Sequence, residues 1–251
     1  MGRVEGKVAL ITGASSGLGL ADAQVLAREG AIVVMTDINT TAGEAAAESI
    51  RANGGKASFL PLDVSSEEQW NSVIDQVREE HGRLDVLVNN AGMVAMGSPE
   101  QCSLESFRKH NSIMSEGVFL GCKIALPLMH ETGGGSIINI ASIASHLGYP
   151  IYYAYSAAKG AVRSMTKAMA VHCLMQGYNI RVNSVHPGGI DTPMVDQTCK
   201  ELGLESKEQL SPVVGLGQPE DVANVVLFLA SDESRWVNGS EIMIDNTLSI
   251  Q

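Results

Sequence analysis

VALITGASSGLG, residues 8–19, is the stretch that decides the fold class of this chain. The apolar run from Val8 to Thr12 predicts a buried strand, and Gly17 to Arg28 predicts a helix directly after it. Glycines between a strand and a helix let the backbone approach a pyrophosphate, which the N–H groups of the helix N-terminus can bind. The same glycines would also suit a plain turn, so the rest of the chain has to support the binding interpretation.

The alternation of strand and helix continues to the C-terminus. Apolar runs predict strands over 31–36, 57–62, 84–89, 136–142, 180–185 and 241–244, and helices are expected over 41–53, 66–80, 104–130, 155–176 and 219–230. Continuous apolar runs are typical of strands that are covered on both faces. We therefore expect an α/β protein, a single domain over residues 1–251 with a Rossmann-type doubly wound parallel sheet and helices on both faces. Residues of about 192–217 lack a strand pattern, which predicts a mobile lid.

Composition excludes several classes of protein. The formal net charge of −11 argues against a nucleic-acid partner, which needs a basic surface. None of the four cysteines, Cys102, Cys122, Cys173 and Cys199, stands at metal-ligand spacing, so reduced thiols are expected. The N-terminus has no apolar signal core and no run of about eighteen apolar residues occurs, so we expect a cytoplasmic protein without a membrane span.

Asp37 stands at the end of the second predicted strand, about twenty residues after the glycines. A carboxylate there can bind the ribose hydroxyls of an adenosine and repels a 2′-phosphate. Its neighbours Ser15, Ser16 and Ile38 supply no cation for such a phosphate. The pattern favours NAD over NADP, and a helix N-cap is the alternative role for Asp37.

Polar residues also follow the third, fourth and sixth predicted strands. They are Asp63-Val64, Asn89-Asn90-Ala91-Gly92 and Pro187-Gly188, with Thr192 shortly after the last pair. The carboxyl ends of parallel strands face the ligand in such a sheet, and the loop after Pro187 could anchor a nicotinamide carboxamide. Ordinary turn chemistry explains the same residues equally well. His186 has no histidine or carboxylate partner in the sequence pattern and is given no role.

Tyr155 and Lys159 lie four residues apart at the start of a predicted helix, so they share one face. A nearby ammonium favours the phenolate and lowers the tyrosine pKa, which makes an acid/base catalyst. Taken alone this spacing usually means a solvated face. Ser142, at the end of the fifth predicted strand, could hold a substrate oxygen while Tyr155 transfers the proton. Tyr149, Tyr152 and Tyr153 lack a lysine four residues later and are interpreted as pocket walls.

Together these motifs resemble the short-chain dehydrogenase/reductase family from Lys7 to about Asn246. The resemblance rests on TGASSGLG at 12–19, Asp37, Asp63, NNAG at 89–92, Ser142, YSAAK at 155–159 and HPGGIDTP at 186–193. It implies that Tyr155 is the acid/base, that Ser142 polarises the carbonyl, and that Lys159 lowers the tyrosine pKa and holds the ribose. The NAD-binding residues that it implies are Gly13, Ser15, Ser16, Gly17, Leu18, Asp37, Ile38, Asp63, Val64, Asn89, Ala91, Gly92, Tyr155, Lys159, Pro187, Gly188, Ile190, Thr192 and Met194.

Several stretches are most similar to bacterial 3β/17β-hydroxysteroid dehydrogenases and related alicyclic alcohol dehydrogenases. They lie at 130–142, 176–194 and 229–250. This similarity implies a hydrophobic secondary alcohol or its ketone as substrate. Family members are usually homotetramers, with the two long helices at an interface.

One position departs from the family pattern. The family usually has an asparagine three residues before a Gly-x-Phe, where it fixes a water in a proton relay through the lysine. Here Met114 stands three residues before Gly117, and a thioether donates no hydrogen bond. We hypothesise that the relay is rerouted or weakened. The rival is that Asn111 takes the role through a helix irregularity.

The leading function is an NAD-linked dehydrogenase of a hydrophobic secondary alcohol, and no metal is expected. Candidate pocket residues, each of which could instead be core, are Val94, Met96, Ser142, Ala144, Tyr149, Tyr152, Gly189, Met194 and Val195. A reductase of another carbonyl class, such as a ketone on an acyl carrier protein, is the alternative within the fold, although acidic carriers prefer basic docking surfaces. A non-catalytic dinucleotide-binding redox sensor is the alternative from another class.

Overall fold

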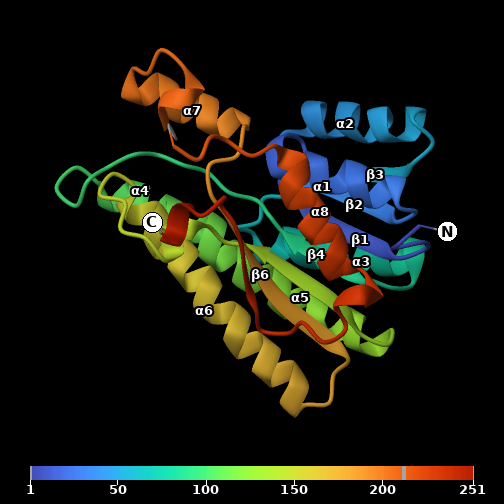
Figure 1. The fold of residues 1–251 in the computed structure, drawn as a ribbon. Coiled ribbons are helices and arrows are strands. Elements are labelled where there is room, and N and C mark those ends of the chain that lie inside the picture. The colour runs from blue at the N-terminus through green and yellow to red at the C-terminus, as the bar shows by residue number, and fades with distance from the viewer. Residues whose placement is uncertain (1, 211–212, 251) are drawn as a thin grey trace.

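A sheet of seven parallel strands forms the centre of the computed structural model, which describes residues 2–210 and 213–250 (Figure 1). The strand order is β3-β2-β1-β4-β5-β6-β7. The strands are β1 Val8–Thr12, β2 Ile32–Asp37, β3 Lys56–Pro61, β4 Val86–Asn89, β5 Gly135–Ile140, β6 Ile180–Pro187 and β7 Glu241–Ile244. After β3 the chain returns to the middle of the sheet, so the direction of winding reverses between β1 and β4. Ligands bind at such a reversal, outside the carboxyl ends of the strands.

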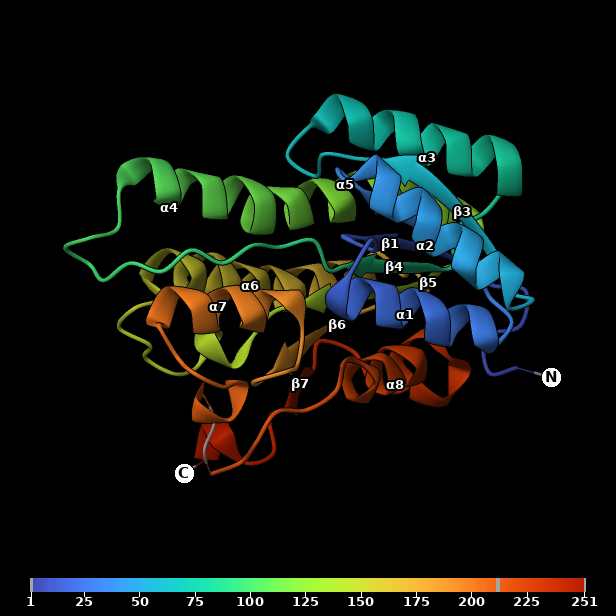
Figure 2. The ribbon, with the colours of Figure 1, turned by 90° about the horizontal axis from the view of Figure 1, so that it is seen from above.

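Helices cover both faces of the sheet, which confirms the predicted fold class (Figure 2). The helices are α1 Gly17–Arg28, α2 Thr40–Ala52, α3 Glu67–His81, α4 Leu104–Asn111, α5 Gly117–Glu131, α6 Tyr153–Met175, α7 Pro193–Leu202 and α8 Pro219–Ala230. One apolar core joins the sheet to α1, α2 and α8, and the other joins it to α3, α5 and α6. All five residues of β1 are buried, as its continuous apolar run requires.

Two strand boundaries differ from the prediction at the site. β5 ends at Ile140, so Ser142 lies beyond the strand and caps a short 3₁₀ turn, Ile143–Ser145. β6 extends to Pro187, because its last residues pair with β7 from Glu241 onward. Apolar runs locate strands well but do not set their ends, which depend on the neighbouring strand.

The segment of about 192–217, expected as a mobile lid because it lacks a strand pattern, contains a helix. α7 starts at Pro193 directly after Thr192, and proline is a favoured first helical residue because it has no N–H to leave unpaired. A short 3₁₀ turn, Lys207–Leu210, follows. Residues 211–212 of the segment lie outside the described part of the chain. The mobility of this lid remains a prediction.

The helix expected over 104–130 is interrupted. α4 and α5 are joined by a π-helical turn, Ser112–Glu116. The combined stretch Leu104–Glu131 is long and apolar enough to cross a membrane by length and composition, contrary to the expectation that no such run exists. Half of its most apolar window is buried in the protein, and buried helices of soluble proteins pass the same test.

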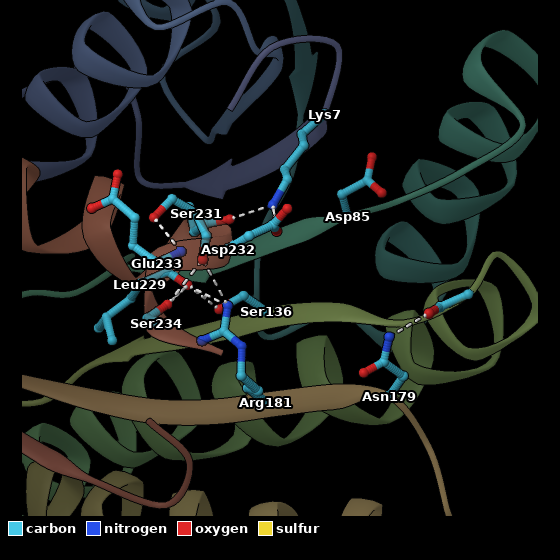
Figure 3. Close-up of polar contacts among 12 residues, drawn as sticks. Lys7, Asp85, Ser136, Asn179, Arg181, Leu229, Ser231, Asp232, Glu233 and Ser234 are labelled. Carbon is cyan, nitrogen blue, oxygen red and sulfur yellow. Dashed lines mark hydrogen bonds and ion pairs between the residues drawn. The ribbon is translucent and has the colours of Figure 1, made fainter. Parts of the chain in front are cut away.

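The end of α8 is fastened to the sheet at the strands' amino ends (Figure 3). The Leu229 carbonyl accepts hydrogen bonds from Ser136 Oγ at 2.8 Å, Arg181 Nη2 at 2.9 Å and Ser234 Oγ at 3.0 Å. The last carbonyls of a helix lack partners within it, so these side chains satisfy an otherwise unpaired acceptor. This anchoring lies at the opposite edge of the sheet from the carboxyl ends.

Asp22 is a charged residue type inside the α1 face of the core. It is fully buried, and neither carboxyl oxygen has a hydrogen-bond partner among the described residues. Burial raises the pKa of this carboxyl well above its usual value. The group therefore stays protonated in the folded chain at pH values where an unfolded aspartate ionises. Its contribution to stability is full below pH of about 4 and declines as the pH rises toward the folded-state pKa.

We predict that Asp22→Ala raises the free energy of unfolding at pH 7.5 by at least about 1 kcal/mol, because an unpaired buried polar group is removed. The gain should shrink as the pH approaches 4. Urea denaturation across this pH range measures it, with Asp75→Ala on the exposed face of α3 as the control. A less stable Asp22→Ala protein at pH 7.5 would contradict the prediction.

Candidate active site

Hydrogen bonds lock the glycine loop after β1 to the segment after β4. Thr12 Oγ1 accepts from the backbone N–H groups of Asn90 and Ala91, both at 3.0 Å. In return, Asn90 Nδ2 donates to the Thr12 carbonyl at 2.9 Å. Gly13 and Gly17 have φ values of +64° and +56°, which favour glycine. The loop is therefore held open at the reversal point of the sheet.

The start of α1 is suited to a phosphate. Ser16 is the N-cap residue, and its side chain makes no capping hydrogen bond. A Cβ at Gly19 would lie 2.4 Å from the Gly13 carbonyl oxygen, so only glycine allows the helix to begin this close to the loop. The loop and the helix N-terminus thus fit a dinucleotide pyrophosphate.

Asp37 lies beside this loop at the end of β2. Its Oδ2 accepts from Ser15 Oγ at 2.7 Å and Ser15 N at 3.1 Å, and its Oδ1 accepts from Asn39 N at 2.9 Å. Asn39, rather than Asp37, is the N-cap of α2. The alternative role of Asp37 as that cap is therefore wrong. Ile38 beside it is 76% exposed and carries no charge.

Three residues that the resemblance places in the NAD site, Asp63, Val64 and Asn89, also make hydrogen bonds within the protein. Asp63 Oδ1 accepts from Ser65 N at 2.9 Å and Ser65 Oγ at 2.7 Å, which is turn chemistry. The Val64 carbonyl accepts from the indole N–H of Trp70 at 3.0 Å. Asn89 Nδ2 donates to Asn139 Oδ1 at 2.8 Å within the core. A role of these residues toward a cofactor stays a prediction.

The loop after β6 reaches back to the glycine loop. A Cβ at Gly17 would lie 3.8 Å from Thr192 Cβ, so the glycine loop and the loop after β6 lie within van der Waals contact distance. Thr192 Oγ1 donates to the Ile190 carbonyl at 3.2 Å, and Gly188 N donates to the Ile244 carbonyl at 2.9 Å. Segments after β1, β4 and β6 therefore meet at one edge of the sheet, as the sequence predicts.

Ser142, Tyr155 and Lys159 converge at the same edge. Ser142 Oγ accepts from Ala144 N at 3.1 Å, so its hydrogen is free to be donated. Tyr155 and Lys159 stand on one face of α6, and Lys159 Nζ lies 5.8 Å from the centroid of the Tyr155 ring. The ammonium donates to the Ile140 carbonyl at 2.7 Å.

Burial dominates the electrostatics of this trio. It raises the pKa of Tyr155 to about 12, although hydrogen bonding to the Ser142 side chain opposes the rise. It also lowers the pKa of Lys159 to about 8. Desolvation of the phenolate is the largest cause of the Tyr155 shift in the protein by itself, and the lowering of this pKa by Lys159 stays a prediction. In this state the phenol holds its proton at neutral pH.

Two other tyrosines, Tyr149 and Tyr152, lie in a row with Tyr155. The ring of Tyr152 lies 6.0 Å from that of Tyr155 and 5.9 Å from that of Tyr149, between centroids. Gly97 N donates to the Ile151 carbonyl at 2.8 Å, which ties the loop after β4 to the tyrosine segment. An open hollow of about 360 Å³ adjoins the segment, lined by Leu147, Gly148, Tyr149, Pro150, Tyr153 and Ser156. Tyr153, which is 53% exposed, thus lines this hollow together with Tyr149.

Sequence reasoning missed the polar residues that support Ser142 from behind. His186 is fully buried, and its Nδ1 lies 3.2 Å from the Ser142 carbonyl oxygen. Arg163 and Glu241, on α6 and β7, complete this support. Only the placement of His186 one residue before Pro187 hinted at the site, since its partners Ser142 and Ser145 come from the turn after β5.

A family model described as Enoyl-(Acyl carrier protein) reductase matches residues 13–249. The chain is 45% identical to a 3-beta-hydroxysteroid dehydrogenase of Comamonas testosteroni, over 98% of this chain and 97% of that protein. This chain belongs to the short-chain dehydrogenase/reductase family. It is therefore an oxidoreductase with a dinucleotide-binding fold.

Other members of the short-chain dehydrogenase/reductase family show similar agreement. A cyclopentanol dehydrogenase of Comamonas sp. (strain NCIMB 9872) is 44% identical, over 98% of each chain. An NADP-dependent (R)-specific alcohol dehydrogenase of Lentilactobacillus kefiri is 40% identical, over 99% of each chain. The crystal structure of a short-chain dehydrogenase/reductase from Burkholderia xenovorans has a TM-score of 0.93 at 36% identity, covering 100% of this chain and 99% of that one.

The position where this family usually has an asparagine lies in the π-helical turn. Met114 is fully buried there, and a Cβ on Gly92 would meet its Sδ at 3.4 Å. Asn111 precedes the turn, and its Nδ2 donates to the Phe107 carbonyl of its own helix at 2.8 Å. The helix irregularity required by the Asn111 alternative is present, but the amide of Asn111 is occupied within α4.

We predict that Met114→Asn changes turnover of a short-chain dehydrogenase/reductase substrate, while Asn111→Ala leaves it within about twofold of the wild type. The reason is that only position 114 is buried against the segment after β4. Steady-state rates with each variant, checked for unchanged folding by circular dichroism, measure this. Unchanged turnover of Met114→Asn together with strongly reduced turnover of Asn111→Ala would show that the asparagine role belongs to Asn111.

Proposed function

We propose that the chain is an NAD(H)-dependent dehydrogenase that interconverts a hydrophobic secondary alcohol, alicyclic or steroidal, and its ketone. The observation that carries the proposal is the meeting of Ser142, Tyr155 and Lys159 at the sheet edge where the glycine loop and Asp37 lie. The nicotinamide would supply or take up the hydride. Gly13, Gly17 and the N-terminus of α1 would hold its pyrophosphate.

The side chains divide the proton chemistry between them. The Ser142 hydroxyl, held through its oxygen by Ala144 N, donates to the substrate oxygen. The Tyr155 phenol, protonated because burial raises its pKa, gives its proton to a ketone oxygen as the carbon is reduced. In oxidation the same oxygen takes the proton from the alcohol. Lys159, fixed by the Ile140 carbonyl, would bind the ribose.

The surroundings favour an uncharged substrate. Val94 and Ala144 are buried, and Tyr149 and Tyr152 present rings along the approach. Apolar walls with a few polar groups are typical of sites for small hydrophobic molecules. The names of the hydroxysteroid and cyclopentanol relatives fit the same substrate class.

We predict that Tyr155→Phe lowers turnover by at least about 100-fold, because the proton donor is lost, while the affinity for NADH stays within about twofold. NADH formation from a panel of cyclic and steroidal alcohols measures turnover, and NADH fluorescence measures binding. Tyr178→Phe, remote from the trio, is the control.

The two alternative functions give different results in the same panel. Binding of NAD without turnover of any alcohol, unaltered by Tyr155→Phe, would favour a redox sensor. Preference for a ketone on an acyl carrier protein would favour the other carbonyl class, against which the net charge of −11 speaks.

The preference for NAD rests on Asp37. Its carboxylate, already held by Ser15, occupies the side of the glycine loop where a 2′-phosphate would lie. Ser15, Ser16 and Ile38 bring no positive charge to that side. Because a relative that is 40% identical is NADP-dependent, the cofactor preference has to be measured on this chain itself.

We predict that the double change Asp37→Ala and Ile38→Arg raises the ratio of kcat/KM for NADP to that for NAD by at least about tenfold, since it removes a like charge and adds an opposite one. Ile38→Arg alone, with the carboxylate kept, is the matched control and should shift the ratio less. A wild-type protein that already prefers NADP would contradict the electrostatic argument.

A homotetramer in the cytoplasm, acting without membrane or nucleic acid, completes the proposal. Apolar side chains stay exposed on the helices expected at the interface, with exposed fractions of 49% for Phe119, 55% for Val171 and 71% for Leu174. Patches of this kind usually mark protein contacts. The four cysteines are free thiols, as suits a reducing compartment.

We predict that light scattering gives a mass four times that of the 26.5 kDa chain, and that Phe119→Asp combined with Leu174→Asp lowers it. A charge buried in an apolar interface destabilises it. Val213→Asp, at an apolar residue that is 83% exposed and belongs to neither α5 nor α6, should keep the mass of the wild type. A monomeric wild type would contradict this part of the proposal.

A further inference from the structure

The carbonyl oxygen of Ser142 is held more tightly than its hydroxyl. It accepts from Ser145 Oγ at 2.6 Å and Ser145 N at 3.0 Å, and His186 Nδ1 lies 3.2 Å away. These contacts close the 3₁₀ turn that begins at Ser142. Within the turn the hydroxyl is held by Ala144 N, and it faces Tyr155 beyond the turn, so the direction in which it points follows from the direction of this turn.

His186 is the contact that comes from outside the turn. It is fully buried on β6, and its Nε2 lies 2.8 Å from Ser184 Oγ. The Ser145 hydroxyl donates its hydrogen to the Ser142 carbonyl, so toward the His186 imidazole it can act only as an acceptor. These partners assign the Nδ1–H tautomer, which donates toward Ser142 and Ser145 while Nε2 accepts from Ser184. Burial lowers the pKa of His186 to about 4, in keeping with a neutral ring.

Arg163 and Glu241 hold the far end of the turn. Arg163, one helical turn after Lys159, donates from Nη1 to the Ser145 carbonyl at 3.2 Å and from Nε to Glu241 Oε2 at 2.9 Å. Lys167 also pairs with Glu241. These contacts fix the turn after Ser142 to β6, β7 and α6 together.

This cluster is a scaffold rather than a metal site. His146, His186 and Glu241 bring ligand atoms within 4.8 Å of one another, as a metal would need. Glu241, however, already faces two cations, Arg163 and Lys167, which would repel a metal ion. Both ring nitrogens of His186 are also engaged in hydrogen bonds.

We propose that His186 is a positioning residue for catalysis, which sets the aim of the Ser142 hydroxyl by fixing the carbonyl of the same residue. The proposal rests on the role of Ser142 in the proposed function. A neutral imidazole with both nitrogens hydrogen-bonded has a single orientation, so it transmits the geometry of β6 to the turn. Displacement of a catalytic group by about 1 Å can cost about 100-fold in rate.

The test is a double-mutant cycle between positions 186 and 142. We expect His186→Leu to lower kcat by about tenfold or more, with the KM for NAD unchanged, since the donor is lost. His186→Asn, whose Nδ2 can occupy the place of Nδ1, should recover most of the rate. In a Ser142→Ala background, His186→Leu should cause no further loss, because no hydroxyl remains to be aimed.

A matched control separates positioning from loss of stability. Ser136→Ala on β5 removes a buried hydrogen bond to the Leu229 carbonyl at the other end of the sheet. It should lower the melting temperature without changing kcat. If His186→Leu does not fold, Ser184→Ala replaces it in the test. Loss of the donor to Nε2 allows His186 to adopt the other tautomer, in which Nδ1 no longer donates to the Ser142 carbonyl. This change should therefore also lower kcat only when Ser142 is present.

The possible failures are distinguishable. An equal fold-loss from His186→Leu, or from Ser184→Ala, with and without Ser142 would overturn the positioning role and leave the proposed function intact. Wild-type turnover by Ser142→Ala itself would overturn the role of Ser142 in the proposed function, and the positioning role with it.

Discussion

The rest of the site depends on the Thr12 hydroxyl and the two backbone N–H groups that it accepts from Asn90 and Ala91. β1 and β4 are neighbours in the sheet but lie far apart in the sequence, and the chain winds away from them in opposite directions. The loops that follow them must separate to admit a ligand and yet keep a fixed spacing. A single side-chain oxygen, with the Asn90 amide returning a bond to the Thr12 carbonyl, meets both needs.

Burial determines the electrostatics of Tyr155 and Lys159, and it also carries a free-energy cost. Desolvation raises the pKa of the Tyr155 phenol and lowers that of the Lys159 ammonium, so both groups are driven toward their neutral forms. Fixed dipoles offset part of this effect: the Ile140 carbonyl faces the ammonium, and Ser142 faces the phenol. An active site of this kind works because its polar groups are placed before the substrate arrives.

Sequence reasoning predicted the elements whose signal is local. The continuous apolar runs gave the strands, and the glycines of residues 13–19 marked the loop whose backbone angles require them. Tyr155 and Lys159 were recognisable because a helix places residues four apart on one face. Ser142 was found although its predicted place, the end of a strand, was wrong by two residues.

What the sequence could not show depends on contacts between distant segments. The π-helical turn at Ser112–Glu116 leaves the apolar pattern nearly unchanged, so it is invisible until the packing around Met114 is known. α7 carries a start signal at Pro193, but it lies outside the sheet and buries only Thr198 and Cys199, so it has no long apolar face of the kind that marks a core helix. The partners of His186 come from β6 and the turn after β5, which only the fold brings together.

The division between fixed and variable parts of the site explains how one sheet edge serves different substrates. The groups that we propose act on the reacting carbon and oxygen lie on α6 and at the start of the short turn after β5. The groups that would contact the remainder of the substrate lie on loops held by few hydrogen bonds, such as that from Gly97 N to the Ile151 carbonyl, and on the segment expected as a lid, where Lys207 pairs with Asp191 and Asp196. Changes in those loops alter the shape of the pocket without moving Tyr155. Relatives that are 40–45% identical and named for different alcohols are what such an arrangement allows.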